Sequence, residues 1–302
     1  MNDARTGVEI AGTQIEDTFA EAFRMRVARL VVTAHDDFWL DAAVREFAGY
    51  SSSIISCDSE AGLERPLAPR ETPDGRKGVA LLVFGFSADA LAEVVPNRVG
   101  QCLMTCPTTA VYDGLSEGEQ RIPLGKTIRY FGDGFQKSKL IAGRRYWRVP
   151  VMDGEFVVEH TAHVAKGVGG GNFIVQGTSA VAALAAARRA IEAINPLPSV
   201  ITPFPGGVAR SGSKVGSRYK KLKASTADEY CPTLRGRVQT KLAEGANAAY
   251  EIVIDGLDEA AVAHAMTEGI RAAAGKDVLA ITAGNYGGKL GKFHFHLHEI
   301  LS

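Results

Sequence analysis

Apolar runs of strand length alternate with longer stretches of helical period along most of the chain. The short runs are rich in β-branched residues, which favours strands, and the Ala-, Leu- and Val-rich stretches have the period of helices that pack on a sheet. The predicted strands are 29–34, 52–56, 79–86, 101–106, 172–177, 199–204, 250–256 and 278–284, with a last strand in KFHFHLHEI (292–300). The predicted helices are 36–47, one that begins at about residue 88, 179–194 and 258–274. The pattern therefore predicts four strand–helix–strand units.

These units form an internal repeat. RLVVTAHDDFWLDAA (29–43) has the same pattern as NFIVQGTSAVAALAA (172–186). VALLVFGFSADALA (79–92) aligns with YEIVIDGLDEAAVA (250–263) without a gap. A repeat of this length indicates that each half of the chain holds two of the units.

Two units in each half predict an α+β fold made of two ferredoxin-like (split βαβ) lobes. We expect the lobes to comprise residues 1–150 and 151–302, to be related by internal duplication, and to meet near WRVPVMDGEF (147–156). A doubly wound sheet is the competing architecture. Its continuous alternation would not leave the two long polar connections, 57–78 and 205–248, that interrupt the pattern.

The second connection has the composition of an ordered segment. It contains PFPGG (203–207), SGSKVGS (211–217) and ASTADEYCPT (224–233), which mix Phe, Tyr, Cys and Pro with small residues. Structureless loops longer than about 15 residues are uncommon unless they are functional or disordered. We interpret this segment as a packed ligand-binding loop.

Composition excludes several classes of partner. Lys and Arg total 34, as do Asp and Glu, so the formal net charge is zero and nothing indicates binding to nucleic acid or to an anionic membrane. No apolar run reaches the roughly 18 residues that span a bilayer. The stretch MNDARTGVEIAGTQI (1–15) lacks the features of a signal peptide, so we expect a cytoplasmic protein. Cys102 and Cys106 have C-x3-C spacing and Cys57 and Cys231 stand alone, which favours small apolar fillers over a zinc site.

Glu251 is the candidate catalytic residue. Alternation along its strand places Glu251, Val253 and Asp255 on one face of the predicted sheet. The structural alternative is a strand-end carboxylate that is exposed or paired with an arginine. The repeat partner of Glu251 is Ala80, so the fold accepts a methyl group here and does not require a carboxylate. A buried glutamic acid has a raised pKa and can donate a proton near neutral pH.

Histidines offer a weaker candidate. His294, His296 and His298 alternate on the last predicted strand, so all three would face one side and could bind a metal. A half-exposed face of a C-terminal strand explains them better, because no cysteine or carboxylate is spaced to complete a site. His160 and His163 fall in a predicted loop and carry no role.

Two glycine-rich stretches do not match the fingerprint of a dinucleotide-binding site, and one of them could lie beside another kind of ligand. GVGGGNF (167–173) precedes a strand, whereas the dinucleotide fingerprint follows a strand and opens a helix. The glycines of AGNYGGKLG (283–291) could let the backbone approach a ligand, or could form a plain turn. Lys214 and Arg218 could hold a carboxylate or phosphate, or could be solvated. No G-x-S-x-G motif occurs, so nucleophilic catalysis finds no support.

Many short motifs in order resemble one family, formylmethanofuran–tetrahydromethanopterin formyltransferase, from about residue 8 to the C-terminus. These motifs are IEDTFAEAF (15–23), RETPDGR (70–76), FGDGF (131–135), GGNF (170–173), PFPGG (203–207), SKVGS (213–217), AST (224–226), YCPT (230–233), YEIVI (250–254), AGNYGGKLG (283–291) and HLH (296–298). The resemblance implies transfer of a formyl group between the amine of methanofuran and N5 of tetrahydromethanopterin. It also implies two ferredoxin-like lobes in each subunit of a homotetramer, with active sites at subunit contacts.

The resemblance further implies that the enzyme uses no metal, no prosthetic group and no covalent enzyme intermediate. The catalytic glutamate of the family lies in the YEIVI strand, where this chain has Glu251. We therefore expect Glu251 to protonate or hydrogen-bond the developing oxyanion. The residues expected to bind the carrier substrates, by shaping the cleft or by offering backbone donors, are Phe204, Pro205, Gly206, Gly207, Ser213, Lys214, Gly284, Asn285, Tyr286 and Gly287.

Some features depart from the family pattern. HTAH (160–163) and His294 do not match it. The chain is neutral where archaeal members tend to be acidic, and RYKKLK (218–223) is basic. These differences suggest a relative from C1-oxidising bacteria that runs toward formylmethanofuran within a formyltransferase/hydrolase complex, where the basic stretch would meet an acidic carrier tail or a partner subunit.

Two other functions stay open at this point. The chain could be a non-catalytic subunit that holds a carrier or scaffolds a complex. It could also be a metal-dependent hydrolase that uses the histidine row.

Overall fold

The computed structural model describes residues 7–302. Residues 1–6 lie outside the described residues; they belong to the predicted N-terminal lobe 1–150 and to the stretch 1–15 that was assessed for a signal peptide. The chain divides into two compact units. One is Met25–Gly167, here called the 25–167 unit. The other, here called the 168–302 unit, joins Val168–Ser302 to the residues that precede Met25.

The 25–167 unit is built on four antiparallel strands. Their order across the sheet is β6, β3, β5, β4. The strands are β3 (Phe19–Thr33), β4 (Glu60–Leu67), β5 (Gly78–Gly85) and β6 (Ala110–Asp113). Two helices, α1 (Asp37–Ala48) and α2 (Ala88–Arg98), begin at Asp36 and Ser87, whose side chains accept backbone N–H groups of the first turn. The apolar faces of the helices and the sheet form one core.

Further strands extend this unit. β10 pairs in parallel with β6, and β9 and β8 follow it. The additional elements are η1 (Pro69–Glu71), η2 (Val99–Leu103), β7 (Gln120–Pro123), α3 (Gly125–Ile128), η3 (Arg129–Gly132), β8 (Lys137–Ile141), β9 (Arg144–Val151) and β10 (Gly154–Glu159). Cys102 and Cys106 pack against the core of this unit, as expected of small apolar fillers.

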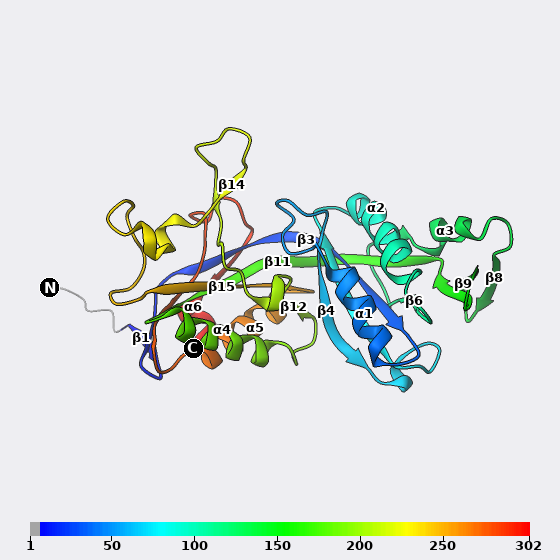
Figure 1. Cartoon of the computed structure of the whole chain (residues 1–302), viewed down its shortest axis with the longest axis horizontal. Helices are drawn as coiled ribbons and strands as arrows, with labels where there is room; N and C mark the ends of the chain where they lie inside the picture. Colours follow the sequence, from blue (N-terminus) through cyan, green and yellow to red (C-terminus); the bar gives the residue numbers. More distant parts are fainter. Residues whose placement is uncertain (1–6) are drawn as a thin grey trace. The chain divides into compact units, whose positions relative to one another are not determined.

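The 168–302 unit repeats the four-strand order, here β16, β11, β15, β12. These strands are β11 (Thr161–Gly177), β12 (Val200–Ile201), β15 (Ala248–Gly256) and β16 (Val278–Thr282). Helices α4 (Ala180–Ile194) and α5 (Glu259–Ala273) begin after the capping residues Ser179 and Asp258. Both helices lie on one side of β11 and β15 (Figure 1).

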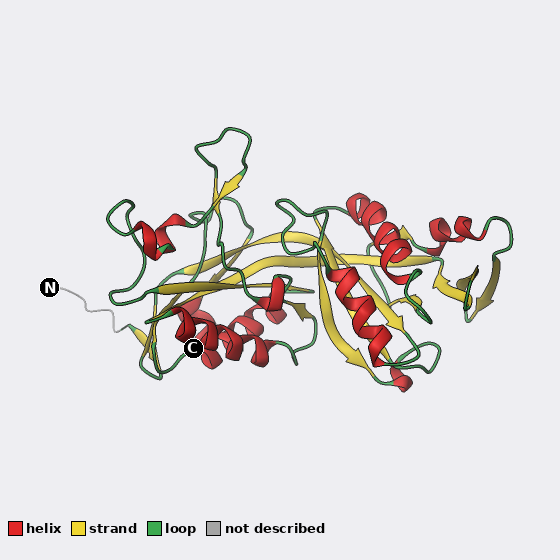
Figure 2. Ribbon diagram, in the orientation of Figure 1, coloured by secondary structure: helices red, strands yellow, loops and turns green. Residues whose placement is uncertain are grey.

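Short elements at both ends of the chain complete the 168–302 unit. β2 pairs with β16, β1 pairs with β2, and β17 pairs with the first residues of β3. These elements are β1 (Val8–Ile10), β2 (Thr13–Ile15), β17 (Phe293–His296) and α6 (Leu297–Leu301). The long connection before β15 holds η4 (Pro205–Gly207), β13 (Lys214–Val215), β14 (Ala224–Ser225), η5 (Asp228–Tyr230) and η6 (Pro232–Leu234), and is mostly loop in Figure 2.

The division into units differs from the predicted boundary between residues 150 and 151. That boundary falls inside β9, in the 25–167 unit. The difference arises because β3 and β11 are long strands that each contribute residues to both units. The first residues of β3 pair with β17, which belongs to the C-terminal part of the chain.

Two predicted strands are wrong. SSIIS (52–56) forms turns, and the strand that pairs with β5 is β4, later in the chain. The reason is local: the backbone N–H of Ile54 donates to Glu60 Oε1 at 2.9 Å, which fixes a turn before β4. QCLMTC (101–106) continues α2 through the π-helical turn η2, and Leu103 is buried in the core. The connection 57–78 therefore holds a strand and is not a long loop.

The C-terminal strand is shorter than predicted. It ends at His296, and Leu297–Leu301 form α6. The strand predicted at 199–204 is likewise reduced to the two residues of β12. Among the described residues, no helix is long and apolar enough to cross a membrane.

Candidate active site

The sheet of the 168–302 unit has one apolar and one polar face. Phe173 and Val175 of β11 and Ile252 and Ile254 of β15 point into the core beneath α4 and α5. Alternation places the neighbouring residues on the opposite face. This polar face carries Asn172, Gln176, Glu251 and Thr282, and the irregular 205–248 connection passes on its side (Figure 1). The candidate site therefore lies on the sheet face opposite α4 and α5, which loops cover in place of helices.

Glu251 lies in the middle of this face. It pairs with Ile174, which on its other side pairs with Thr282, so the three residues form a row across three strands. Its backbone N–H donates to the carbonyl of Ala209 at 3.1 Å, and the Ala209 N–H donates to the Glu251 carbonyl at 2.8 Å. This bridge fixes the start of the long connection beside the carboxyl group.

Burial raises the pKa of Glu251 from 4.5 to about 7. The residue as a whole is half-buried, yet its carboxyl group is surrounded by protein, and desolvation disfavours the charged form. A large share of the molecules thus carries a protonated carboxyl group at neutral pH. Such a group can donate a hydrogen bond or a proton to a ligand.

Asn172 holds Gly284 beside Glu251. The Asn172 amide donates to the carbonyls of Gly170 and Gly284 at 3.1 Å each, and its Oδ1 accepts the Gly284 N–H at 2.6 Å. A side chain at position 284 would place its Cβ 3.6 Å from Glu251 Oε1 and 3.2 Å from Asn172 Oδ1. Glycine therefore lets the backbone approach the carboxyl group closely. The sequence analysis did not single out Asn172.

Glu21 anchors the rest of the loop that follows β16. It accepts backbone N–H groups from Tyr286, Gly288, Leu290 and Gly291 at 2.5–2.9 Å. Burial alone would raise the pKa of this carboxyl group, but the four N–H groups outweigh burial and hold the pKa below its usual value. Glu21 is therefore ionised.

Several backbone N–H groups of this loop, which were expected to bind a ligand, have partners within the protein. The N–H groups of Tyr286 and Gly288 donate to Glu21, and that of Gly284 donates to Asn172. The N–H of Gly287 donates to Asn285 Oδ1 at 3.1 Å. Gly284 and Tyr286 thus lie close to Glu251, and the amide protons of Gly284, Tyr286 and Gly287 are engaged within the protein.

Two phenol groups lie near Glu251. Burial raises the pKa of Tyr230 to about 12, although a hydrogen bond with Thr282 acts in the opposite direction. Burial also raises the pKa of Tyr286, whose side chain hydrogen-bonds Ser213. Both phenols interact electrostatically with Glu251 and stay protonated at neutral pH, so both are O–H donors. Tyr286 was expected at the site, whereas Tyr230 was not.

PFPGG reaches the site through its backbone. Gly206 and Gly207 have φ values of 62° and 79°, which favour glycine. A Cβ at Gly207 would also meet the Ile191 side chain at 2.4 Å, so this turn packs directly on α4. Phe204 is half-buried and Pro205 is exposed. The turn leads within two residues to Ala209, the backbone partner of Glu251.

Lys214 is paired within the connection. Its Nζ lies 2.5 Å from Asp228 Oδ2, so the side chain is not a free cation. Both Ser213 and Lys214 are exposed, and the basic stretch 218–223 forms the exposed tip of the hairpin between β13 and β14. The hydrogen bond between Ser213 and Tyr286 connects the base of this hairpin to the loop beside Glu251.

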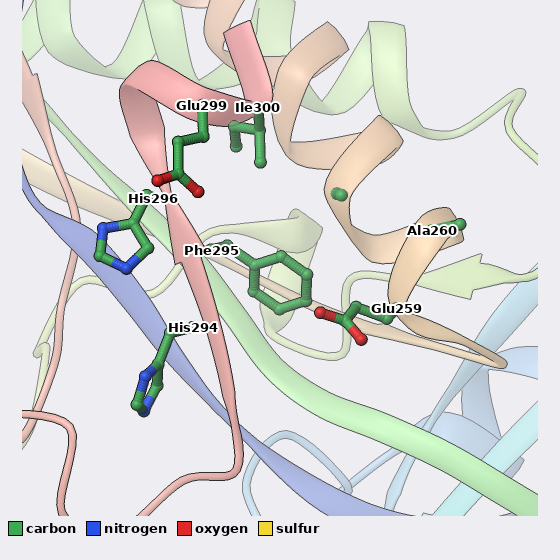
Figure 3. A pocket seen from close by; sticks show the side chains of 8 residues that line it. Glu259, Ala260, His294, Phe295, His296, Glu299 and Ile300 are labelled. Atoms are coloured by element: carbon green, nitrogen blue, oxygen red, sulfur yellow. The ribbon is translucent and has the colours of Figure 1, made fainter.

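The histidines do not form the predicted row. His294 and His296 lie on β17 and stack on Phe19, with ring centroids 5.1 Å apart in each case, whereas His298 lies in α6. Within residues 7–302, no group of three or more His, Cys, Asp or Glu side chains is arranged to hold a metal. An open pocket of about 390 Å³ lies beside β17, where Phe295 points toward α5 and both histidine rings point the other way (Figure 3).

Both His160 and His163 were expected in a loop, and His160 lies in the short connection between β10 and β11, whereas His163 lies in a strand. His163 lies on β11, where its Nδ1 is 2.5 Å from Asp113 Oδ2 and its Nε2 accepts from Arg121 at 2.9 Å. His160 accepts a hydrogen bond from Trp147 Nε1 at 2.9 Å. Burial lowers the pKa of His160, and nearby basic side chains add to the effect.

Comparison with known proteins gives a consistent family match over both halves of the chain. The family described as formylmethanofuran-tetrahydromethanopterin formyltransferase matches residues 8–151, and its proximal-lobe family matches residues 154–300. Formylmethanofuran–tetrahydromethanopterin formyltransferase from Methylococcus capsulatus is 54% identical over 297 residues, which cover 97% of this chain and 99% of the relative.

Two solved structures are similar in fold and sequence. The formylmethanofuran:tetrahydromethanopterin formyltransferase of Methanosarcina barkeri has a TM-score of 0.92 and 46% identity, covering 97% of this chain and all of the other. The formyltransferase/hydrolase complex of Methylorubrum extorquens, solved with methylofuran, contains a chain with a TM-score of 0.95 and 45% identity, covering 98% of this chain and 99% of that one.

Proposed function

Because the chain belongs to the formylmethanofuran–tetrahydromethanopterin formyltransferase family, we propose that it transfers a formyl group between N5 of tetrahydromethanopterin and the amine of methanofuran or a close variant. The observation that carries the proposal is the Glu251 carboxyl group, which lies on the polar sheet face with its pKa raised to about 7. Its position in the YEIVI strand is the one at which the family resemblance implies a catalytic glutamate.

The chemistry places two demands on the site. The acceptor amine attacks the formyl carbon, a C–N bond forms, and the carbonyl oxygen becomes an oxyanion in a tetrahedral intermediate. Both carriers must be held at about 3–3.5 Å in reaction geometry. A donor must also stabilise the oxyanion. The intermediate then collapses, the C–N bond to the donor nitrogen breaks, and that nitrogen leaves with a proton.

Glu251 is the proposed donor. In its protonated form it donates a hydrogen bond to the oxyanion and then gives its proton to the leaving nitrogen, and the proton that the acceptor amine loses restores the protonated carboxyl group. The N–H groups of Gly284, Tyr286 and Gly288 near it are engaged with Asn172 and Glu21, so side chains are the further candidate donors for a ligand. The phenols of Tyr286 and Tyr230, which interact electrostatically with Glu251, are two such candidates.

The other expected site residues are proposed to bind the carriers. Phe204 and the turn Pro205–Gly207 would shape the cleft, and the backbone bridge between Glu251 and Ala209, two residues after the turn, supports this. Gly284, Asn285, Tyr286 and Gly287 would shape its opposite side. Ser213 would act through Tyr286. Lys214 would have to break its ion pair with Asp228 before it could bind a carboxylate or phosphate of a ligand.

Formyl transfer in both directions, with the purified chain and both carriers, tests the proposal. Glu251→Gln keeps the shape of the side chain and should lower turnover by ~10²-fold or more, the usual scale for general acid–base groups. Glu244→Gln is the matched control, because Glu244 is an exposed carboxylate in the connection just before β15. This variant should leave turnover unchanged. Near-wild-type turnover in Glu251→Gln would refute the assignment.

The solved bacterial complex favours a second candidate. In this reading, the chain is a non-catalytic subunit that binds a carrier or scaffolds a formyltransferase/hydrolase complex. Binding of a pterin without formyl exchange in either direction would support it. An intact Glu251 beside intact PFPGG and AGNYGGKLG segments supports the catalytic function instead.

Further proposals concern the setting of the enzyme. We infer a cytoplasmic homotetramer that uses both carriers as substrates, needs no prosthetic group and runs toward formylmethanofuran in bacterial formaldehyde oxidation, alone or with partner subunits. We also infer that the lobes 1–150 and 151–302 are ferredoxin-like and arose by duplication. The shared strand order supports this, as does the register, in which Ala80 pairs with Val31 as Glu251 pairs with Ile174.

A further inference from the structure

Glu21 is a buried carboxylate whose hydrogen bonds all serve one loop. It lies near the start of β3 with 1% of its surface exposed. Its Oε2 accepts the N–H groups of Tyr286 and Gly288 at 2.6 and 2.9 Å, and its Oε1 accepts those of Leu290 and Gly291 at 2.6 and 2.5 Å. Hydrogen bonds to a charged group are stronger than neutral ones, so this cluster fixes the loop path from residue 286 to residue 291.

The same loop contacts the reacting carboxyl group at its other end. Gly284 is held against Glu251 by Asn172, and Tyr286 interacts with Glu251 through its phenol. The Glu21 N–H also donates to the Gly284 carbonyl at 3.2 Å. The backbone and side chain of Glu21 thus bind both ends of the segment that covers Glu251.

We propose that Glu21 is a positioning residue for formyl transfer, which holds the loop 284–291 closed over Glu251 by accepting its backbone N–H groups. This inference rests on the proposed function of Glu251. A glutamine at position 21 offers one acceptor oxygen, and its NH2 group would face N–H donors. That oxygen can accept two of the four N–H groups, so the other two would face the NH2 group without an acceptor, and the loop would open.

Loop opening has a defined electrostatic consequence. The pKa of Glu251 is raised to about 7 by desolvation, so water that enters past Gly284 would lower it toward 4.5. The titratable groups that face these carboxylates are Tyr230 and Tyr286 beside Glu251, and His294, which pairs across the strands with Glu21. Both phenols have raised pKa values and stay neutral through this range.

Hydrogen exchange tests the positioning role without reference to activity. In Glu21→Gln, we expect the amides of Tyr286, Gly288, Leu290 and Gly291 to lose protection, while amides in the centre of β11 keep theirs. Glu9→Gln is the matched control, because Glu9 is an exposed carboxylate in β1 of the same unit, and it should change neither set. Unchanged protection of the four loop amides in Glu21→Gln would overturn the proposal.

The pH profile tests the connection to catalysis. In Glu21→Gln, we expect kcat/KM at pH 7 to fall by about tenfold or more, and the alkaline limb of its pH profile to move down by at least about one unit as Glu251 becomes hydrated. A purely structural role would lower the amount of folded protein without moving that limb. A lower kcat/KM with an unmoved alkaline limb would therefore contradict the proposal.

A second variant covers the case in which Glu21→Gln does not fold. Glu21→Asp keeps the charge but shortens the side chain, so we expect partial loss of loop protection and a smaller shift of the profile. Wild-type behaviour of Glu21→Asp in both measurements would overturn the proposal when the glutamine variant is unfolded. If the wild-type chain transfers no formyl group, the proposed function fails, whereas the exchange experiment still decides whether Glu21 holds the loop.

Discussion

Glu251 changes its charge in the pH range in which cytoplasmic enzymes work, because burial raises its pKa to about 7. The proposed mechanism uses the protonated carboxyl group. We therefore expect kcat/KM to fall tenfold per pH unit above pH 7, as the ionised form accumulates. Glu251→Gln cannot ionise, so its residual activity should lack this decline. A decline of equal slope in that variant would show that another group is responsible.

The same ionisation should appear in the stability of the wild-type protein. The folded-state pKa lies above the ordinary value of 4.5, so the stabilising effect of the buried neutral form is complete below pH 4.5 and is lost as the pH rises through 7. A rise of the Glu251 pKa from 4.5 to about 7 corresponds to about 3 kcal/mol. We expect urea unfolding to show the wild type losing up to about 3 kcal/mol, relative to Glu251→Gln, between pH 5 and pH 8. A constant difference between the two proteins would contradict the raised pKa.

Sequence could identify Glu251 but not the residues that control it. Glu251 stands out because the repeat places Ala80 in the same position, which shows that the scaffold does not need a carboxylate there. Glu21 and Asn172 lie on strands that are far from residue 251 in sequence, and their roles depend on backbone N–H groups of a distant loop. A loop conformation is not encoded in any period or spacing, so these partners became visible only in three dimensions.

At the scale of elements, close packing of α5 on β11 depends on a missing side chain. A Cβ at Gly171 would lie 2.3 Å from a methyl group of Val262, in the middle of the core of the 168–302 unit. Gly171→Ala should destabilise the protein by about 1–3 kcal/mol in urea unfolding, because overpacking forces backbone shifts. Gly100→Ala is the control, since nothing lies within 4 Å of its Cβ position, and it should be neutral or slightly stabilising. Equal stability of both variants would contradict this view of the core.

The helices were predictable because they carry their own signals. Asp36, Ser87, Ser179 and Asp258 each cap a helix next to an apolar period, and all four helices occur where the pattern placed them. Strands depend on partners that are distant in sequence. SSIIS (52–56) forms a turn that the hydrogen bond from the Ile54 N–H to Glu60 fixes, and β5 pairs instead with Glu60–Leu67, whose charged residues and proline do not give a strand pattern.

At the scale of the whole molecule, the two halves of the chain share a strand order, but the sequence repeat did not predict the division into units. The two family matches, 8–151 and 154–300, follow the sequence halves. The compact units do not, because the first residues of β3 pair with β17 at the other end of the chain. Sequence repeats show which segments correspond to each other. They do not show that a strand near one end of the chain pairs with a strand near the other end, as β3 does with β17.

The assembly separates the two functions that stay in competition. If the chain is a self-sufficient enzyme, light scattering after size exclusion should give about four times its 32.1 kDa, and that species should transfer formyl groups. If the chain is a carrier-binding subunit, it should be inactive alone, and activity should appear only after partner subunits are added. Active material with the mass of one chain would contradict the proposed tetramer but keep the catalytic role. Inactive tetramers that gain no activity with partner subunits would contradict both the enzyme and the complex.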